Sequence, residues 1–295
     1  MNGLVVMAYG TPRRPEEIEA YYTDIRRGRP PTPEQLADLV RRYDAIGGLS
    51  PLAERTEAQR TAIATELGAD WTVATGLRHA DPSIETAVAD VVAAGAERIT
   101  GLVLAPHFSS MSVAAYHGRA RVAAEAAGVV YSAIDSWAAD AAYVAFLANA
   151  VRASLETMPD GSHVLFTAHS LPQRVIADGD PYPTEVGATA SSVADEAELT
   201  DGTWSVGWQS AGRTPEPWLG PDVLEEIDRL AEDGTPGLVV CPCGFVSDHL
   251  EVLYDLDIEA SHRAADRGLP FARTAVVNDD ATVMRSLAGL VRATS

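Results

Sequence analysis

The chain has 295 residues, of which 46% are hydrophobic and 22% are charged, and its formal net charge is −20. It has no stretch near the roughly 20 apolar residues that a membrane-spanning helix needs, so we expect a globular protein with room for two domains. A surface this acidic repels phosphate backbones, which argues against nucleic acid as a partner. All 22 basic residues are arginines, and this excludes a Schiff-base lysine and a lysine-bearing phosphate loop.

The first residues and the cysteines indicate a compartment. Met1–Tyr9 is a short apolar run that leads directly into Gly10-Thr11-Pro12, without the basic flank and long apolar core of an export signal. The only cysteines, Cys241 and Cys243, are too few for a four-thiolate site and fit a reducing environment. We therefore expect a cytoplasmic protein.

Short β-branched runs alternate with longer amphipathic stretches along the whole chain. The runs typical of strands are Gly3–Tyr9, Trp71–Leu77, Ile99–Ala105, Val129–Ile134, His163–Ala168, Trp204–Trp208, Gly237–Cys241 and Phe271–Val276. The stretches typical of helices include Pro15–Arg27, Pro33–Tyr43, Leu52–Leu67, Ser83–Ala94, Val113–Ala127, Asp140–Leu155, Asp222–Glu232 and Asp248–Arg267. This alternation predicts an α/β protein whose parallel sheets are covered on both faces.

Eight strands could form one wide sheet, but the loop around Asp135-Ser136-Trp137 favours a seam between two doubly wound lobes. We expect an N-terminal lobe over residues 1–136, completed by a C-terminal helix over 279–295, and a second lobe over 137–278. Ligands bind such folds beyond the carboxyl ends of the strands, where a cleft between lobes would lie. No GxGxxG turn follows a strand, so a dinucleotide site has little support.

Three residues capable of chemistry follow predicted strands. Tyr9 follows the first, His107 the third and His169 the fifth. Each signal is weak by itself, because a histidine in such a place is as often a structural residue with satisfied hydrogen bonds.

The segment after the seventh strand is more specific. Glu251, Asp255 and Glu259 are each four residues apart, a spacing that stacks three carboxylates on one helix face. Like charges at this spacing repel each other, so the stripe needs solvent or a cation, and a divalent metal would suit it. Two other interpretations are a solvated acidic face and, for Asp248 with Glu251, a helix-capping pair.

Several longer motifs resemble those of the ferrochelatase family, most closely its compact soluble bacterial form that acts on coproporphyrin. They occur in the family's order and span nearly the whole chain. The matching segments are Val6–Pro12, Tyr21–Gly28, Arg42–Leu52, Leu104–Ser109, Thr167–Pro172, Gly207–Pro221 and Gly244–Glu251.

This resemblance implies two Rossmann-like lobes with four-stranded parallel sheets and a porphyrin cleft between them. It implies insertion of Fe²⁺, a substrate, into coproporphyrin III to form iron-coproporphyrin in haem biosynthesis, without an organic cofactor. His169 and Glu251 carry over as the catalytic and metal-binding pair, Asp255 and Glu259 as an acidic path behind them, and Tyr9 as an axial ligand of product iron. The matching porphyrin-binding positions are Tyr9, Arg26, Arg42, Tyr43, Ser50 and Tyr116.

Residue chemistry agrees with these roles. A planar guanidinium binds a propionate through two hydrogen bonds, and histidine can accept a proton near neutral pH or ligate Fe²⁺. Whether His169 acts as base, ligand or both stays open, as do the face of metal entry and the iron donor.

Some features limit the resemblance. The tail over residues 278–295 has no cysteine, so we expect no iron–sulfur cluster, and Cys241 and Cys243 are interpreted as core residues. No hydrophobic C-terminal extension is present, which favours a monomer without a membrane span that transiently hands its product to the next enzyme. The open alternatives are a protoporphyrin IX ferrochelatase, a cobalt or nickel chelatase for a more reduced tetrapyrrole, and a non-catalytic haem carrier using Tyr9.

Overall fold

The computed structural model describes residues 1–212 and 214–295. It contains two four-stranded sheets in which every strand pair is parallel. The first has the order β2-β1-β3-β4, and the second has the order β6-β5-β7-β8. The strands are β1 (Asn2–Ala8), β2 (Trp71–Leu77), β3 (Arg98–Val103), β4 (Val130–Ile134), β5 (His163–His169), β6 (Trp204–Gln209), β7 (Leu238–Cys241) and β8 (Phe271–Arg273). The prediction of two parallel sheets, rather than one wide sheet, is confirmed.

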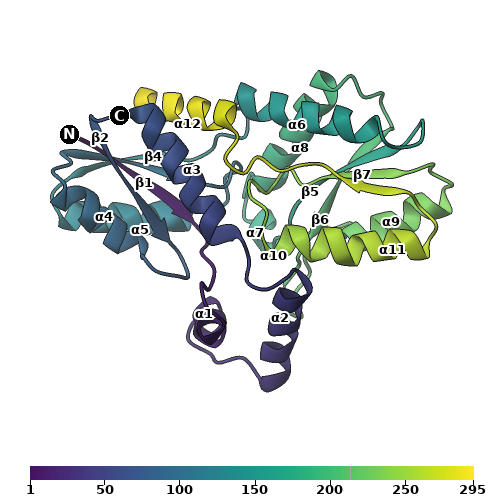
Figure 1. The fold of residues 1–295 in the computed structure, drawn as a ribbon, viewed down its shortest axis with the longest axis horizontal. Coiled ribbons are helices and arrows are strands. Elements are labelled where there is room, and N and C mark those ends of the chain that lie inside the picture. Colours follow the sequence, from purple (N-terminus) through teal and green to yellow (C-terminus); the bar gives the residue numbers. More distant parts are fainter. Residues whose placement is uncertain (213) are drawn as a thin grey trace.

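Helices cover both faces of each sheet (Figure 1). On one face lie α3 (Leu52–Leu67) and α12 (Ala281–Thr294) beside the first sheet, and α6 (Ala141–Leu155) and α8 (Tyr182–Glu196) beside the second. On the other face lie α4 (Ile84–Ala93) and α5 (Val113–Ala126), and then α9 (Val223–Glu232) and α11 (Ser261–Asp266). Helix α12 packs along α3 and also contacts α6, so the C-terminal helix touches elements of both halves.

The two helical layers differ in how they join the halves. Side chains of β1, α3, α12, α6, α8 and β5 form one continuous apolar core, which runs from Leu4 through Met284 to Phe166. On the opposite face the core of α4 and α5 and the core of α9 and α11 are separate clusters. The halves are therefore fused along one face only.

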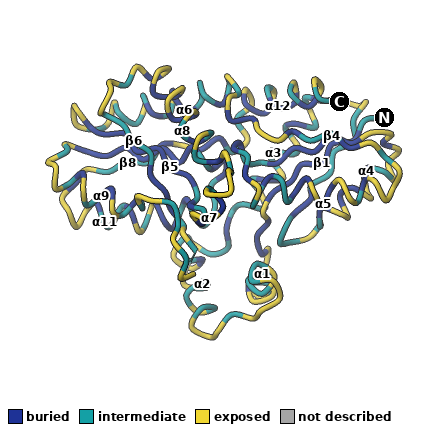
Figure 2. The backbone as a smooth tube through the Cα atoms, turned by 180° about the vertical axis from the view of Figure 1, so that it is seen from behind, coloured by how far each residue is buried: buried dark blue, intermediate teal, exposed yellow. Residues whose placement is uncertain are grey.

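The first crossover connection, from β1 to β2, carries an additional pair of helices. These are α1 (Ile18–Ile25), preceded by a 3₁₀ turn at Pro15–Glu17, and α2 (Pro33–Ala45). Each buries a single residue, Ile18 in α1 and Tyr43 in α2. They project away from the sheets, and their other residues are partly or fully exposed (Figure 2).

The strand and helix predictions hold closely except between β5 and β6 and in the last quarter of the chain. The helix predicted over Asp248–Arg267 is present from Leu250 to Asp266, but it is not a regular α-helix: α10 (Leu250–Leu253) is followed by a π-helical turn (Asp255–Ala260) and then by α11. Asp248 and His249 precede the helix in extended or irregular backbone. Strand β8 ends at Arg273 rather than Val276, and α7 (Gln173–Ala177) and α8 were not among the expected helices. No helix among the described residues is long and apolar enough to cross a membrane.

Candidate active site

The central strands β1 and β5 occupy equivalent places in the two sheets. In each sheet the chain proceeds from the central strand to one side and then returns to the other, which makes the carboxyl end of that strand a topological switch point. Tyr9 directly follows β1, and His169 is the last residue of β5. The fold thus puts both predicted residues where α/β proteins bind ligands.

Glycine shapes the chain after β1. Gly10 has a φ of +89°, and a Cβ at this position would lie 2.9 Å from the Cβ of Ala80, so only glycine fits without strain. The hydroxyl of Tyr21 in α1 donates to the carbonyl of Gly10 over 3.2 Å, which ties the projecting helix to this turn. Tyr9 itself is held at 39% exposure, an unusual value for a residue at the end of a buried strand.

Tyrosines gather on the first-half side of the site. Tyr43 and Tyr116 are buried, at 3% and 5% exposure, and burial raises the pKa values of Tyr9, Tyr21, Tyr43 and Tyr116 above their usual 10. The negative charge of Glu251, in the second half, also raises the pKa of each of these four phenols. These phenols stay neutral near physiological pH.

Two residues on this side of the site were not among those predicted from the sequence. The Arg78 guanidinium lies over the Tyr116 ring at 5.4 Å and donates to the Met111 carbonyl at 2.9 Å. The His79 ring stands 4.6 Å from that of Tyr9, with Nδ1 2.6 Å from the Asp24 carboxylate. Both residues directly follow β2. The rule that ligands bind beyond the carboxyl ends of parallel strands, which indicated Tyr9 and His169, therefore applies to them as well.

Hydrogen bonds fix the ring nitrogens of two histidines on the second-half side. His169 Nδ1 lies 2.5 Å from the Ser170 carbonyl, and His249 Nδ1 lies 3.0 Å from the Ser247 carbonyl. A carbonyl only accepts, so Nδ1 carries the hydrogen in both and Nε2 is left to meet a proton or a cation. Burial lowers the pKa of His249, against the opposing charge of Glu251.

Both Nε2 atoms face one carboxylate oxygen. Glu251 Oε2 lies 3.7 Å from Nε2 of His169 and 3.9 Å from Nε2 of His249. Donors that each bond a first-row cation at about 2.1 Å are roughly 3.0 to 4.2 Å apart, depending on the angle at the metal. Each histidine–glutamate pair therefore has the spacing of two metal ligands, although no group of three histidine, cysteine or acidic side chains in the described part of the chain forms a metal site.

The backbone of Glu251 is anchored by residues of β5 and β6. Gln209, fully buried at the end of β6, donates to the Glu251 carbonyl at 2.9 Å and accepts from the Thr167 hydroxyl at 2.9 Å. The turn after β7 lies against β5, where a Cβ on Gly244 would fall 2.5 Å from that of Ala168. These contacts hold the Glu251 segment next to His169.

Asp255 lies behind Glu251 and is only 8% exposed. Its carboxylate accepts from the Ser210 hydroxyl at 2.5 Å, and Ser210 has a left-handed φ of 59°, a strain that this hydrogen bond helps to hold. Burial raises the pKa of Asp255 to about 7, with the charge of Glu251 acting in the same direction and Arg42 opposing it. Asp255 can therefore take up or release a proton near neutral pH.

The three carboxylates do form a series, but not on a regular α-helix. Residues four apart on an α-helix are offset by about 40°, whereas the π turn at Asp255–Ala260 holds more residues per turn and reduces that drift. The series runs from part-exposed Glu251 through buried Asp255 to exposed Glu259. Asp255 contradicts the solvated-face interpretation. The capping-pair interpretation is also wrong, because α10 has no side-chain cap and Asp248 bonds Asn278 instead.

The predicted porphyrin-binding residues differ in the contacts that they make. Arg42 lies 3.3 Å from Asp255 and over the Tyr254 ring at 4.6 Å, so it is already engaged with the second half. Arg26 lies at the end of α1, over the Tyr22 ring at 5.7 Å. The Ser50 hydroxyl accepts from the Leu52 amide at the start of α3.

His107, a candidate from the sequence, proves to be structural, and the two cysteines lie in the core. His107 is 2% exposed, and its Nε2 contacts the Thr189 hydroxyl at 2.9 Å. Burial lowers the pKa of His107 to about 3. Cys241 and Cys243 are fully buried, and burial raises the pKa of both thiols, as expected of core residues.

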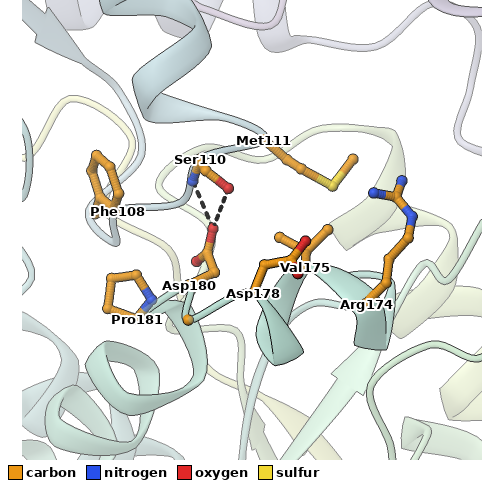
Figure 3. A pocket seen from close by; sticks show the side chains of 9 residues that line it. Phe108, Ser110, Met111, Arg174, Val175, Asp178, Asp180 and Pro181 are labelled. Atoms are coloured by element: carbon orange, nitrogen blue, oxygen red, sulfur yellow. Dashed lines mark hydrogen bonds between the residues drawn. The ribbon is translucent and has the colours of Figure 1, made fainter.

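An open volume of about 270 Å³ lies elsewhere, between the loop after β3 and the segment around α7. Its lining includes Phe108, Met111 and Val175, with Arg174 at one edge (Figure 3). Asp180 accepts from the amide and hydroxyl of Ser110 there, which ties the two halves together. None of the predicted site residues lines this volume, and Met111 connects it to the site only through Arg78.

Comparisons with known proteins agree with this arrangement. The ferrochelatase family model matches residues 1–295. The chain is 44% identical over 301 residues to the coproporphyrin III ferrochelatase of Geobacillus kaustophilus (strain HTA426), covering 98% of this chain and 94% of that protein. It is 41% identical over 299 residues to the enzyme of the same name from Oceanobacillus iheyensis (strain DSM 14371), covering 98% and 95%.

Two solved chelatase structures share the fold. SirB from Bacillus subtilis with Fe³⁺ has a TM-score of 0.63 at 13% identity, covering 100% of this chain and 96% of that one. CbiX, described as the terminal enzyme of sirohaem biosynthesis in denitrifying bacteria, has a TM-score of 0.56 at 15% identity, with both chains covered completely. Identities this low bear on the fold alone.

Proposed function

The chain belongs to the ferrochelatase family, and we propose that this metal-inserting enzyme acts in haem biosynthesis by inserting Fe²⁺ into coproporphyrin III to form iron-coproporphyrin. The observation that carries the proposal is the convergence of His169 and His249 on the carboxylate of Glu251, in a site whose other half carries the neutral Tyr9 after β1. The names of the relatives at 41–44% identity support the choice of porphyrin.

The reaction demands proton acceptors and metal donors at one place. As Fe²⁺ forms bonds to the four ring nitrogens, two pyrrole N–H protons must leave and the cation must lose its water. His169 Nε2, with its hydrogen fixed on Nδ1, has a lone pair that can accept one proton or hand over the cation. Glu251, beside it, supplies a hard oxygen ligand and a second acceptor.

Asp255 and Glu259 continue from Glu251 to the surface. We propose that this series carries the cation inward or the protons outward. Asp255, with a pKa raised to about 7, can relay a proton without a large free-energy cost at neutral pH.

The tyrosine side would receive the macrocycle. Neutral phenols and the apolar faces of their rings suit a flat, apolar ring, and Tyr9 can ligate the iron of the product from the first-half side. Arginines must recognise the propionates, since the chain has no lysine. Arg26, Arg42 and Arg78, with the hydroxyls of Tyr43, Ser50 and Tyr116, are the proposed contacts.

The proposed reaction requires no organic cofactor, and two cysteines cannot supply an iron–sulfur cluster with four thiolates. We further propose that the enzyme works as a monomer in the cytoplasm and releases iron-coproporphyrin to the next enzyme through a transient contact.

The test is an anaerobic insertion assay with Fe²⁺ and either coproporphyrin III or protoporphyrin IX. We expect a higher kcat/KM for coproporphyrin III, because four propionates offer more sites to guanidinium groups than two. We also expect His169→Ala and Glu251→Gln to lower turnover about 100-fold or more.

The matched control is His163→Ala, which removes a histidine from the opposite end of the same strand. A preference for protoporphyrin IX would overturn the substrate assignment. Wild-type insertion rates in both site variants would overturn the metal centre, and tight haem binding without insertion would identify a carrier.

A further inference from the structure

The π turn that presents the acidic series is an uncommon conformation, and an arginine outside the site bonds to it. Arg273, the last residue of β8, donates through Nε and Nη2 to both carboxylate oxygens of Asp257, at 2.6 and 2.8 Å. Asp257 lies within the π turn, two residues from Asp255 and two from Glu259. A two-point contact of this kind fixes orientation as well as distance.

The same guanidinium reaches the segment that carries His249 and Glu251. Its Nη1 lies 3.4 Å from Oδ1 of Asp248, a buried oxygen that has no hydrogen-bond partner. The other oxygen of Asp248 accepts from the Asn278 side chain at 2.8 Å. Arg273 therefore stands between two carboxylates, one on each segment that supplies the proposed metal donors.

Contacts behind Asp248 make this support rigid. The Asn278 side-chain oxygen accepts from the Asp248 amide at 2.9 Å. Gln59 of α3, fully buried, donates to the carbonyls of Val246 and Asn278 at 3.0 and 2.8 Å. Arg273 is itself only 17% exposed, so its charge is poorly solvated and is balanced by these carboxylates.

We infer that Arg273 is a positioning residue for metal insertion. By contacting both segments, it fixes the position of the π turn relative to the His249–Glu251 segment. A π turn is rarer than an α-helical turn, and here outside contacts hold it: Asp257 bonds Arg273, while Asp255 bonds Ser210 and Arg42. Without the Asp257 contact, relaxation by one residue to an α-helical register would rotate the residues after the turn by about 100° relative to Glu251. This inference rests on the proposed function, because only that function gives the positioned side chains a role as metal donors.

The test compares Arg273→Gln, Arg273→Lys and Asp257→Asn in the full chain. In Arg273→Gln we expect the KM for Fe²⁺ to rise about 10-fold while the KM for coproporphyrin III stays within about twofold. Asp257→Asn should act in the same direction, and the double variant should be no worse than Arg273→Gln. Arg273→Lys should rescue only part of the effect, since an ammonium cannot make the two-point contact.

Arg263→Gln is the matched control. Arg263 makes a similar two-point contact, with Asp228, but it joins α11 to α9 away from the strand ends. We expect it to lower thermal stability without moving either KM. If Arg273→Gln does not fold, Asp257→Asn decides the outcome, because Asp257 is more exposed and its loss leaves Arg273 next to Asp248.

A Co²⁺ titration, followed by visible absorption without porphyrin, separates this inference from the proposed function. Weaker Co²⁺ binding in Arg273→Gln, but not in Arg263→Gln, supports the positioning role even if the wild type inserts no iron. Unchanged Co²⁺ affinity and unchanged KM for Fe²⁺ in folded Arg273→Gln would overturn it. An equal rise of both KM values would also overturn it, because that would indicate a general structural defect.

Discussion

The two halves of the molecule share one strand order but carry different chemistry at equivalent positions. In the first half Tyr9 follows the central strand, and this side also carries the buried phenols of Tyr43 and Tyr116 and the Arg78 guanidinium. The second ends its central strand with His169 and adds His249, Glu251 and Asp255. The difference shows that one scaffold can present different side chains at equivalent strand ends, and in the proposed function the first half binds the flat ring while the second handles the cation and protons.

The largest expected effect comes from a change in the second half, which is proposed to handle the cation. It should lower turnover and leave porphyrin binding by the first half intact. His169→Ala should lower turnover by about 100- to 10,000-fold, the usual contribution of a proton-transfer group. Porphyrin affinity, measured by fluorescence quenching, should stay within about twofold. Because His169 and Glu251 act as a unit, the double variant with Glu251→Gln should be no slower than the slower single variant. An equal loss of affinity and turnover would contradict the division between the halves.

The second prediction concerns pH and depends on Asp255 in the second half. The carboxyl of Asp255 has an ordinary pKa of 3.8 and a folded pKa of about 7. Its stabilising contribution is therefore complete below about pH 4 and is lost as pH rises through 7. A difference of this size corresponds to at most about 4 kcal/mol in the free energy of unfolding.

Asp255→Asn should remove much of that loss. Urea unfolding at pH 5 and pH 8 would show a smaller stability difference in the variant than in the wild type, although the lost contact with Arg42 reduces the gain. Asp266→Asn, an exposed change on α11, serves as the control. A variant with the same pH dependence as the wild type would show that Asp255 does not titrate in this range.

The third prediction concerns porphyrin binding, which is proposed for the first half. Arg78→Gln should raise the Kd for coproporphyrin III about 10-fold and leave kcat within about twofold, because it removes a cation near Tyr116 that can meet a propionate. Arg121→Gln is a close control, since Arg121 also lies 5.4 Å from a tyrosine ring, that of Tyr131. A fall in kcat with unchanged Kd would place Arg78 in the chemical step instead.

The smallest effect on rate is expected at Tyr9. Tyr9→Phe keeps the ring beside His79 and removes only the hydroxyl, so insertion should change by no more than about twofold. The visible spectrum of bound iron-coproporphyrin should change, because a phenyl ring cannot ligate iron. Tyr22→Phe, on α1, is the control. An identical product spectrum in Tyr9→Phe would exclude Tyr9 as the axial ligand.

Sequence patterns predicted the sheets well because buried parallel strands are short apolar runs, as in β5, and amphipathic helices repeat at 3.6 residues. They missed the π turn within the helix predicted over Asp248–Arg267, because the four-residue spacing of carboxylates also fits an α-helix. Asp257 in the π turn contacts Arg273, 16 positions away, and no local pattern encodes that contact. Likewise, the engagement of Arg42 by Asp255 joins residues 213 positions apart.

The apolar core shared by α3, α12, α6 and α8 has a consequence for how the enzyme accommodates a macrocycle. A continuous, densely packed layer resists shear, so the two sheets should behave as one rigid body and not close around a ligand like jaws. Adjustment to the substrate then belongs to α1 and α2, which bury one residue each. Two rigidly joined sheets with one adjustable pair of helices are suited to bending a stiff, planar ring. The sheets do not move when the ring presses on them, so the force deforms the ring instead.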